Sequence, residues 1–215
     1  MIEHNRLNFI EGLGNNCELG FVLRKMGHER GFYFRSVAAR TASVSQIIEQ
    51  DFDGAYQFDN LLPHPGDMVM DTAFGAAYHG RMPSRDVSGE LSFSDDDAAR
   101  RATHAQDCGK IKHLVSRFRQ NLSCSGMVYV VKDPSAKPSQ IDNLFKLISE
   151  RRTNPNFTFL EMHELPVRAG EVDIVSPNRA VGYLSFIAPF NKTDQGDQES
   201  WVSVLDRVVP KIDAP

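Results

Sequence analysis

The sequence predicts an α+β or α/β fold in a single domain over residues 1–215. Helical patterns of apolar residues alternate along the chain with short apolar runs of strand length. In the second half, apolar runs at 127–131 and 157–160 flank a helical pattern, which predicts a β-α-β unit with parallel strands and a right-handed crossover. A length of 215 residues suits one domain, and the sequence contains no internal repeat or linker that would divide it.

The first elements are predicted to bring a cysteine to the start of a helix. Residues 7–13 predict a short strand that ends in Gly-Leu-Gly. Between residues 17 and 26, apolar residues fall at the i, i+3, i+4 and i+7 positions of one helical face. Asn15 or Asn16 can cap this helix, because a short amide side chain accepts hydrogen bonds from the first turn.

The middle of the chain predicts extended segments followed by a polar stretch. The aromatic run at 31–35 indicates a strand or a buried extended segment, and a capping box at residue 43 indicates a short helix. Two short apolar runs at 68–72 and 76–79, joined by three residues that end in glycine, predict a β-hairpin. We expect the polar segment at about 80–106 to be a surface excursion with at most one helical stretch late in it.

The second half shows clearer patterns. An aspartate can cap a helix from residue 107, and the apolar runs on either side of the next helix have the length of buried strands. The expected elements are helix 107–122, strand 127–131, helix 138–154, strand 157–160, strand 181–187 and helix 199–209.

Composition excludes several classes of protein. Charged residues make up 24% and hydrophobic residues 41%, which is incompatible with a disordered or fibrous chain. The formal net charge of −4 argues against nucleic-acid binding, because phosphate contacts need a basic excess. No apolar run approaches the roughly 20 residues of a membrane span, and residues 1–6 lack the pattern of a secretion signal. We therefore expect a cytoplasmic protein that does not cross a membrane.

The three cysteines are widely spaced, odd in number and without a CxxC pair. Free thiols are expected, because this usage does not suit a disulfide framework or a structural zinc site. His104 and Cys108 lie four residues apart and could form half of a metal site, but no second pair accompanies them. We expect neither a metal nor a cofactor.

Cys17 is the strongest candidate for chemistry. It begins the predicted helix, where unpaired backbone N–H groups and the positive end of the helix dipole favour the thiolate. A thiol in such a position has a pKa below its usual value of about 8.5. Cys17 projects away from the apolar face of the helix, and Phe21 and Arg24 share its side. The alternative is a cysteine that packs as a small hydrophobic residue.

His79 is the best candidate for the base that a nucleophilic cysteine needs. It ends the second strand of the predicted hairpin. If residues 72 and 76 pair, Asp71 opposes Ala77, and Asp71 and His79 are diagonal neighbours on one face. Asp71 would then orient the imidazole. The alternative is a half-exposed histidine beside a solvated aspartate.

The segment 13–18, Leu-Gly-Asn-Asn-Cys-Glu, and the segment 22–25, Val-Leu-Arg-Lys, resemble the signature of the papain-like cysteine peptidase family of bacteria. The resemblance covers about residues 8–133. It implies a papain-like α+β fold in which the cysteine helix packs on a mixed sheet. It also implies that Cys17 is the nucleophile, that His79 is the general base, and that the substrate is a peptide, amide or ester. Further similar features are the aromatic segment 32–35, Tyr78-His79, the basic helix 110–119 and the strand 128–132.

The sequence departs from this family pattern in two places. Residues 34–36 read Phe-Arg-Ser where the family usually has Phe-Asp-Trp, and Gly80 replaces the acidic residue that often follows the histidine. In papain-like folds the third member of the triad follows the histidine in the chain, whereas Asp71 precedes it. Asp133 suits that order better, so the orienting carboxylate stays open between Asp71 and Asp133.

Three roles compete for this chain. The first is a thiol hydrolase or acyl-transfer enzyme, in which backbone N–H groups at the start of the helix stabilise the oxyanion and Asn15 or Asn16 adds a side-chain donor. The second is a non-catalytic or sugar-nucleotide-binding module. Relatives of this sequence type resemble companions of bacterial surface-polysaccharide systems, and the C-terminal β-α-β unit could hold a glycan-related ligand at its strand ends. The third is a structural domain in which Cys17 is merely packed.

Overall fold

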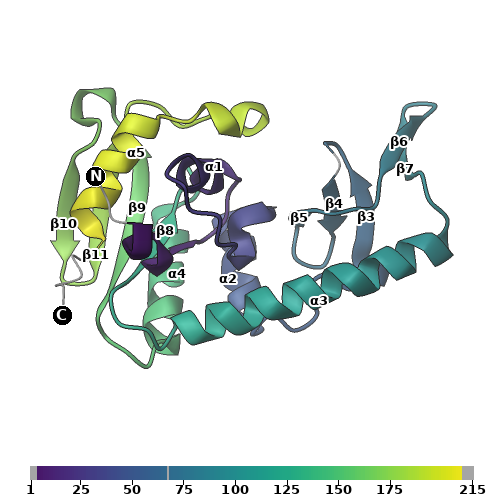
Figure 1. The fold of residues 1–215 in the computed structure, drawn as a ribbon, viewed down its shortest axis with the longest axis horizontal. Helices are drawn as coiled ribbons and strands as arrows, with labels where there is room; N and C mark the ends of the chain where they lie inside the picture. The colour runs from purple at the N-terminus through teal and green to yellow at the C-terminus, as the bar shows by residue number, and fades with distance from the viewer. Residues whose placement is uncertain (1–3, 67, 210–215) are drawn as a thin grey trace.

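The structure, a computed structural model, describes residues 4–66 and 68–209 (Figure 1). Its largest sheet has five strands in the order β1-β8-β9-β11-β10. The first four run parallel to their neighbours, and β10 is antiparallel to β11 at the edge. The strands are β1 (Ile10–Gly12), β8 (Met127–Val131), β9 (Phe157–Glu164), β10 (Val172–Ser176) and β11 (Arg179–Leu184).

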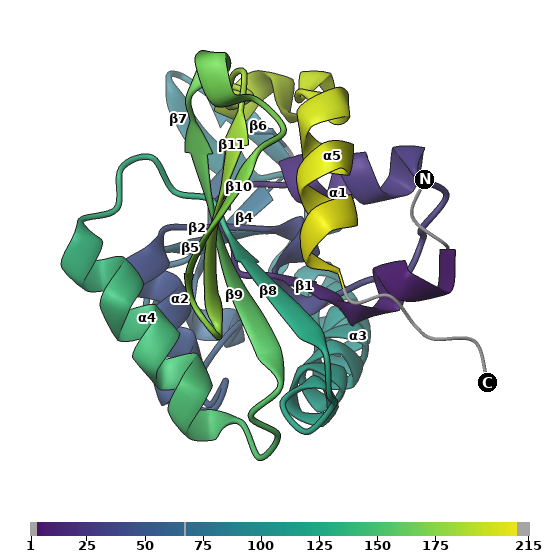
Figure 2. The ribbon, with the colours of Figure 1, turned by 90° about the vertical axis from the view of Figure 1, so that its left-hand side faces the viewer.

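Helices cover both faces of this sheet, as a parallel sheet requires. Figure 2 shows α2 (Thr41–Glu49) and α4 (Pro138–Arg151) on one side, and α1 (Glu18–Lys25) and α5 (Gln198–Val208) on the other. All five residues of β8 are buried, and alternate side chains enter two hydrophobic clusters, one on each face. The continuous apolar run that predicted this strand therefore reflects its burial on both sides.

A second sheet is antiparallel and has the order β2-β5-β4-β3. Helix α3 (Asp97–Asn121) runs from this sheet to the five-stranded sheet, so it joins the two halves of the molecule (Figure 1). A two-stranded hairpin projects at the far end of the antiparallel sheet. The strands are β2 (Val37–Ala39), β3 (Leu61–His64), β4 (Met68–Asp71) and β5 (Ala76–His79), with β6 (Ser84–Val87) and β7 (Glu90–Phe93) in the projecting hairpin.

The structure confirms a mixed fold of helices and sheets, and it confirms the predicted β-α-β unit. β8 and β9 are parallel neighbours joined by α4, and Val130 pairs with Leu160. Leu144 and Ile148 of α4 are fully buried against this sheet. Every helix within the described residues is too short or too polar to span a bilayer.

Some predicted boundaries are wrong for identifiable reasons. Residues 4–9 form a 3-10 helix, so the first strand is only Ile10–Gly12. The aromatic run at 31–35 contributes to a 3-10 helix, Tyr33–Ser36, rather than a strand. The segment 80–106 holds the projecting hairpin and the first turns of α3.

Helix α3 begins ten residues before the predicted cap at Asp107. Asp96 caps it, because its side chain accepts a hydrogen bond from the Ala99 N–H at 2.8 Å. The first turns of α3 are largely exposed and polar, and apolar periodicity cannot detect a helix that buries no continuous face there.

Candidate active site

A tight turn after β1 places Cys17 at the start of α1. Gly14 has a φ of +81°, and a Cβ at this position would lie 2.6 Å from the Val44 side chain and 2.9 Å from the carbonyl oxygen of Ala39. Only glycine fits such a backbone. Asn15, with a φ of 72°, completes the turn and donates its N–H to the same Ala39 oxygen at 2.8 Å. The chain then enters the helix, with Cys17 as the residue directly before it.

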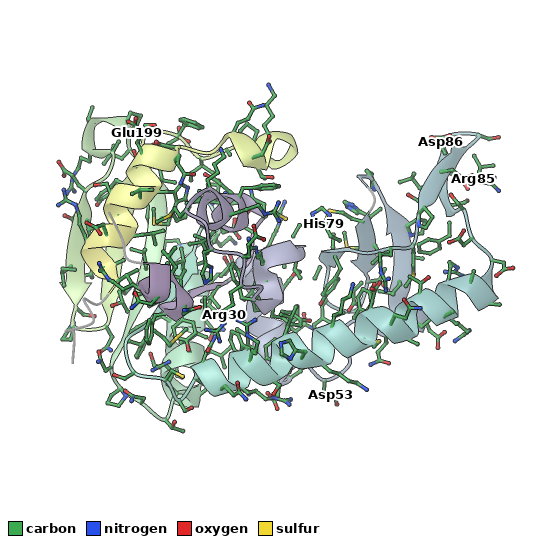
Figure 3. The ribbon with its side chains drawn as sticks, in the orientation of Figure 1. Arg30, Asp53, His79, Arg85, Asp86 and Glu199 are labelled. Carbon is green, nitrogen blue, oxygen red and sulfur yellow. The ribbon has the colours of Figure 1, made fainter. Side chains whose placement is uncertain are left out.

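His79 lies at the end of β5, and Figure 3 shows it on the side of the antiparallel sheet that is turned toward α1. The Cys17 Sγ atom is 3.3 Å from His79 Nε2. Sixty-two residues separate the two positions in the chain. The structure thus brings together the thiol and the imidazole that sequence reasoning selected, at hydrogen-bonding distance for sulfur.

The electrostatic setting of Cys17 differs from the expectation. Burial raises the pKa of the Cys17 thiol above its usual value, and the nearby Lys132 and Arg35 cations offset only part of this. The expected lowering of the Cys17 pKa at the helix start is therefore not found, because removal of the thiol from water outweighs the favourable charges. Burial thus favours the neutral thiol over the thiolate.

Asp71 does not orient His79. Asp71 pairs with Ala76 across the hairpin, not with Ala77, and this one-residue difference in register places Asp71 and His79 on opposite faces. The buried Asp71 carboxylate accepts hydrogen bonds from the N–H groups of Tyr56, at 2.7 Å, and Ala73, at 3.0 Å. Asp71 therefore holds the turn and a neighbouring loop.

The Asp133 carboxylate likewise accepts hydrogen bonds from groups other than His79. Its two oxygens accept hydrogen bonds from the backbone and hydroxyl groups of Thr41 and Ser135, at 2.6–3.1 Å. Burial raises the pKa of Asp133, but these hydrogen bonds, those from Ser135 first, outweigh burial and lower it overall. Within the described part of the chain, no carboxylate bonds to the His79 ring.

Asn16 holds the first turn of α1. Its side-chain oxygen accepts hydrogen bonds from the Glu18 N–H at 3.1 Å and from Lys132 Nζ at 2.9 Å. The predicted N-cap is therefore wrong by at least one position, because Cys17 is the N-cap residue and forms no side-chain capping bond, while Asn16 binds the Glu18 N–H from the position before it. Asn16 lines the cavity at the sheet edge described below and not the pocket that contains Cys17, so its role as an oxyanion donor stays a prediction.

A buried ion pair anchors the same turn. Lys132, directly after β8, pairs with Glu18 at the start of α1, and both side chains are almost fully inaccessible. Trp201 Nε1 donates to the other Glu18 oxygen at 2.9 Å. Burial lowers the pKa of the Lys132 ammonium, and the Glu18 carboxylate offsets only part of this. No local pattern in the sequence indicates this pair, because its two residues lie 114 positions apart in the chain.

A pocket of about 220 Å³ opens beside the thiol. Arg35 is a buried wall of this pocket, although the sequence showed it only as a departure from a family pattern. Phe21 and Arg24 form the opposite wall, and the helical spacing of the sequence had placed both on the same side of the helix as Cys17. The residues that line the pocket are Cys17, Gly20, Phe21, Arg24, Arg35 and His79.

A larger cavity of about 710 Å³ lies at the carboxyl ends of the parallel strands. Parallel α/β sheets usually bind ligands at this edge. Three carboxylates line the cavity, and Arg179 bonds one of them, Glu161, at 2.5 Å. The polar residues of its lining include Asn15, Asn16, Asp133, Glu161, His163, Glu164 and Arg179.

The second cysteine–histidine pair lies on α3. Cys108 Sγ is 3.4 Å from His104 Nε2, which also lies 2.8 Å from the carbonyl oxygen of Tyr56. Among the described residues, no group of three or more His, Cys, Asp or Glu side chains is arranged to hold a metal ion.

Comparisons with models of protein families, with curated proteins and with solved structures found no match. The resemblance of residues 13–25 to papain-like cysteine peptidases therefore stays a prediction.

Proposed function

We propose that the protein is a thiol-dependent hydrolase or acyl-transfer enzyme in which Cys17 is the nucleophile and His79 the general base. The observation that carries this proposal is the 3.3 Å contact between Cys17 Sγ and His79 Nε2 beside an open pocket. The resemblance to papain-like cysteine peptidases supports the same assignment, with a peptide, amide or ester as substrate.

The reaction starts from the neutral thiol that burial favours. His79 Nε2 accepts the thiol proton as Cys17 Sγ attacks the substrate carbonyl, so a sulfur–carbon bond forms and an oxyanion develops. The bond to the leaving group then breaks, the leaving group takes the proton from the imidazolium, and a thioester remains on Cys17. Water or an acceptor nucleophile attacks this thioester, and its proton returns through His79 to the sulfur.

The start of α1 supplies donors for the oxyanion. The Phe21 N–H bonds to the Cys17 carbonyl oxygen at 3.1 Å and the Glu18 N–H bonds to Asn16 Oδ1, so the N–H groups of Leu19 and Gly20 are the donors that remain in the first turn. Preorganised backbone donors of this kind stabilise the charge that develops in acyl transfer.

The proposal is tested with p-nitrophenyl acetate at pH 7. We expect a burst of one equivalent of nitrophenolate and an acetyl group on Cys17, located by mass spectrometry. Cys17→Ala should remove the burst, and His79→Gln should slow acylation about a hundredfold, the loss typical of a missing general base. Cys124→Ala and His113→Gln change an exposed cysteine and an exposed histidine elsewhere, and serve as controls. Acetylation of Cys124 in preference to Cys17, or a burst that is unaffected by His79→Gln, would contradict the proposal.

The cavity at the sheet edge favours a second candidate function, a module that binds a glycan-related ligand. A carboxylate such as that of Glu164, which lines the cavity, can accept hydrogen bonds from sugar hydroxyls, and the cavity is large enough for a sugar nucleotide.

Thermal unfolding of Cys17→Ala with UDP-glucose, and with glucose as the uncharged comparison, tests this second candidate. Binding is expected to raise Tm, and at about 100 times Kd it would stabilise the fold by about 2.7 kcal/mol. An unchanged Tm with both compounds would contradict the binding module.

A further inference from the structure

We propose that the Cys17 site selects substrates with a carboxylate or phosphate group close to the reacting carbonyl, which Arg24 and Arg35 would bind. This inference rests on the proposed thiol chemistry and names its substrate class. The alkylation experiment separates a failure of the anion preference from a failure of the thiol chemistry.

One face of α1 forms the floor of the site. Cys17, Gly20, Phe21 and Arg24 have the spacing i, i+3, i+4 and i+7, so they lie in one stripe along the helix. The exposed Arg24 guanidinium lies 5.5 Å from the centre of the Phe21 ring, a position in which an aromatic ring holds a cation. The thiol and this guanidinium therefore face the same pocket.

Arg35 brings a second guanidinium to the thiol from the opposite wall. Its nitrogens donate to the carbonyl oxygens of Arg30 at 2.7 Å, Gly20 at 3.1 Å and His28 at 3.4 Å. Gly20 permits this approach, because a Cβ there would lie 2.9 Å from Arg35 Cγ and 3.3 Å from its Nε. The arginine is thus held in place by neutral backbone groups.

The charge of these two arginines is not balanced within the site. Neither forms an ion pair with a described carboxylate, and no Asp or Glu lines the pocket. Burial lowers the pKa of Arg35, and the Arg24 charge lowers it further, by more than the exposed Glu29 raises it. A buried cation without a counter-ion is costly in free energy. An anionic ligand would therefore form charge-assisted hydrogen bonds with both guanidinium groups without displacing a carboxylate of the protein. By contrast, Lys132 behind the site is neutralised by Glu18.

The charge preference is measured with two reagents of similar size that both alkylate a thiol with loss of iodide. Iodoacetate is an anion and iodoacetamide is neutral. We expect the iodoacetate-to-iodoacetamide rate ratio at Cys17 to exceed that of the neutral thiol N-acetylcysteinamide about tenfold at low salt. Added salt should reduce the excess.

Two variants assign this preference to the arginines. Arg24→Gln changes an exposed side chain and should remove most of the excess, and Arg35→Met tests the buried partner. Arg85→Gln, on the projecting hairpin, is the matched control and should leave the ratio unchanged (Figure 3). Protection of Cys17 from iodoacetamide by succinate or by inorganic phosphate distinguishes a carboxylate site from a phosphate site.

The outcomes separate the two proposals. A Cys17 that reacts with both reagents at the ratio of the free thiol, in the native protein and in Arg24→Gln alike, overturns the anion preference and leaves the thiol chemistry standing. A Cys17 that reacts with neither reagent overturns the thiol chemistry itself, and the anion preference with it.

Discussion

Replacing Lys132 with methionine is expected to lower the free energy of unfolding by about 3–5 kcal/mol, because the change leaves Glu18 as a buried carboxylate without its partner. The two side chains are 5% and 0% exposed. The Lys132 ammonium also bonds Asn16, the residue before Cys17, so the same variant loosens the turn that presents the thiol. Urea denaturation at pH 7 measures the loss.

Removing both charges should recover most of that stability. In Lys132→Met/Glu18→Gln, the glutamine can still accept the hydrogen bond of Trp201, and neither of the two substituted side chains carries a charge. Lys146→Met is the surface control. Its exposed ion pair with Glu150, at 3.7 Å, contributes less than about 0.5 kcal/mol. A loss smaller than about 1 kcal/mol in Lys132→Met would show that the buried pair does not hold the fold.

Replacing Glu11 with glutamine is expected to stabilise the protein at alkaline pH. Glu11 lies in β1 and is 1% exposed, and Asn121 Nδ2 donates to its Oε2 at 2.7 Å. Burial raises the pKa of Glu11 from 4.5 to about 7, although the Asn121 hydrogen bond and the Arg117 charge act in the opposite direction. A pKa of about 7 in the folded state against 4.5 in the unfolded chain corresponds to roughly 3 kcal/mol.

The sign of this effect depends on pH. Below pH 4.5 the Glu11 carboxyl is protonated in both states, so its contribution to stability is fully present. As the pH rises through about 7, the unfolded chain releases the proton more readily than the folded protein, and that contribution is lost. Glu11→Gln should therefore match the native protein near pH 4.5 and exceed it by roughly 3 kcal/mol at pH 8.

Urea denaturation across this pH range measures the difference. Glu90→Gln, on the exposed hairpin, is the control and should show the pH profile of the native protein. A parallel pH dependence in the native protein and in Glu11→Gln would contradict this account.

The sequence predicted those parts of the fold that depend on local patterns. The apolar run at 127–131 and the helical spacing of 138–151 were sufficient for the β-α-β unit, because each pattern records the burial of its own element. The start of α3 was placed at residue 107 because its outer turns bury no continuous face. Cys17 and His79 were selected from their positions at a helix start and a strand end.

The rest of the site depends on how distant elements pack. A one-residue difference in the register of the hairpin turned Asp71 away from His79, and side-chain alternation makes any such difference decisive. Arg35 enters the site because Gly20 leaves room for it, and that contact joins two segments with no shared pattern.

By itself, the sequence determined the β-α-β unit and selected a thiol at a helix start and an imidazole at a strand end, because apolar periodicity and turn residues are local properties. Tertiary structure alone decided the burial that raises the pKa of Cys17, the pairing of Lys132 with Glu18 and the cationic walls of the pocket. These depend on burial and on charges that meet across up to 114 residues of chain, and no local pattern encodes either.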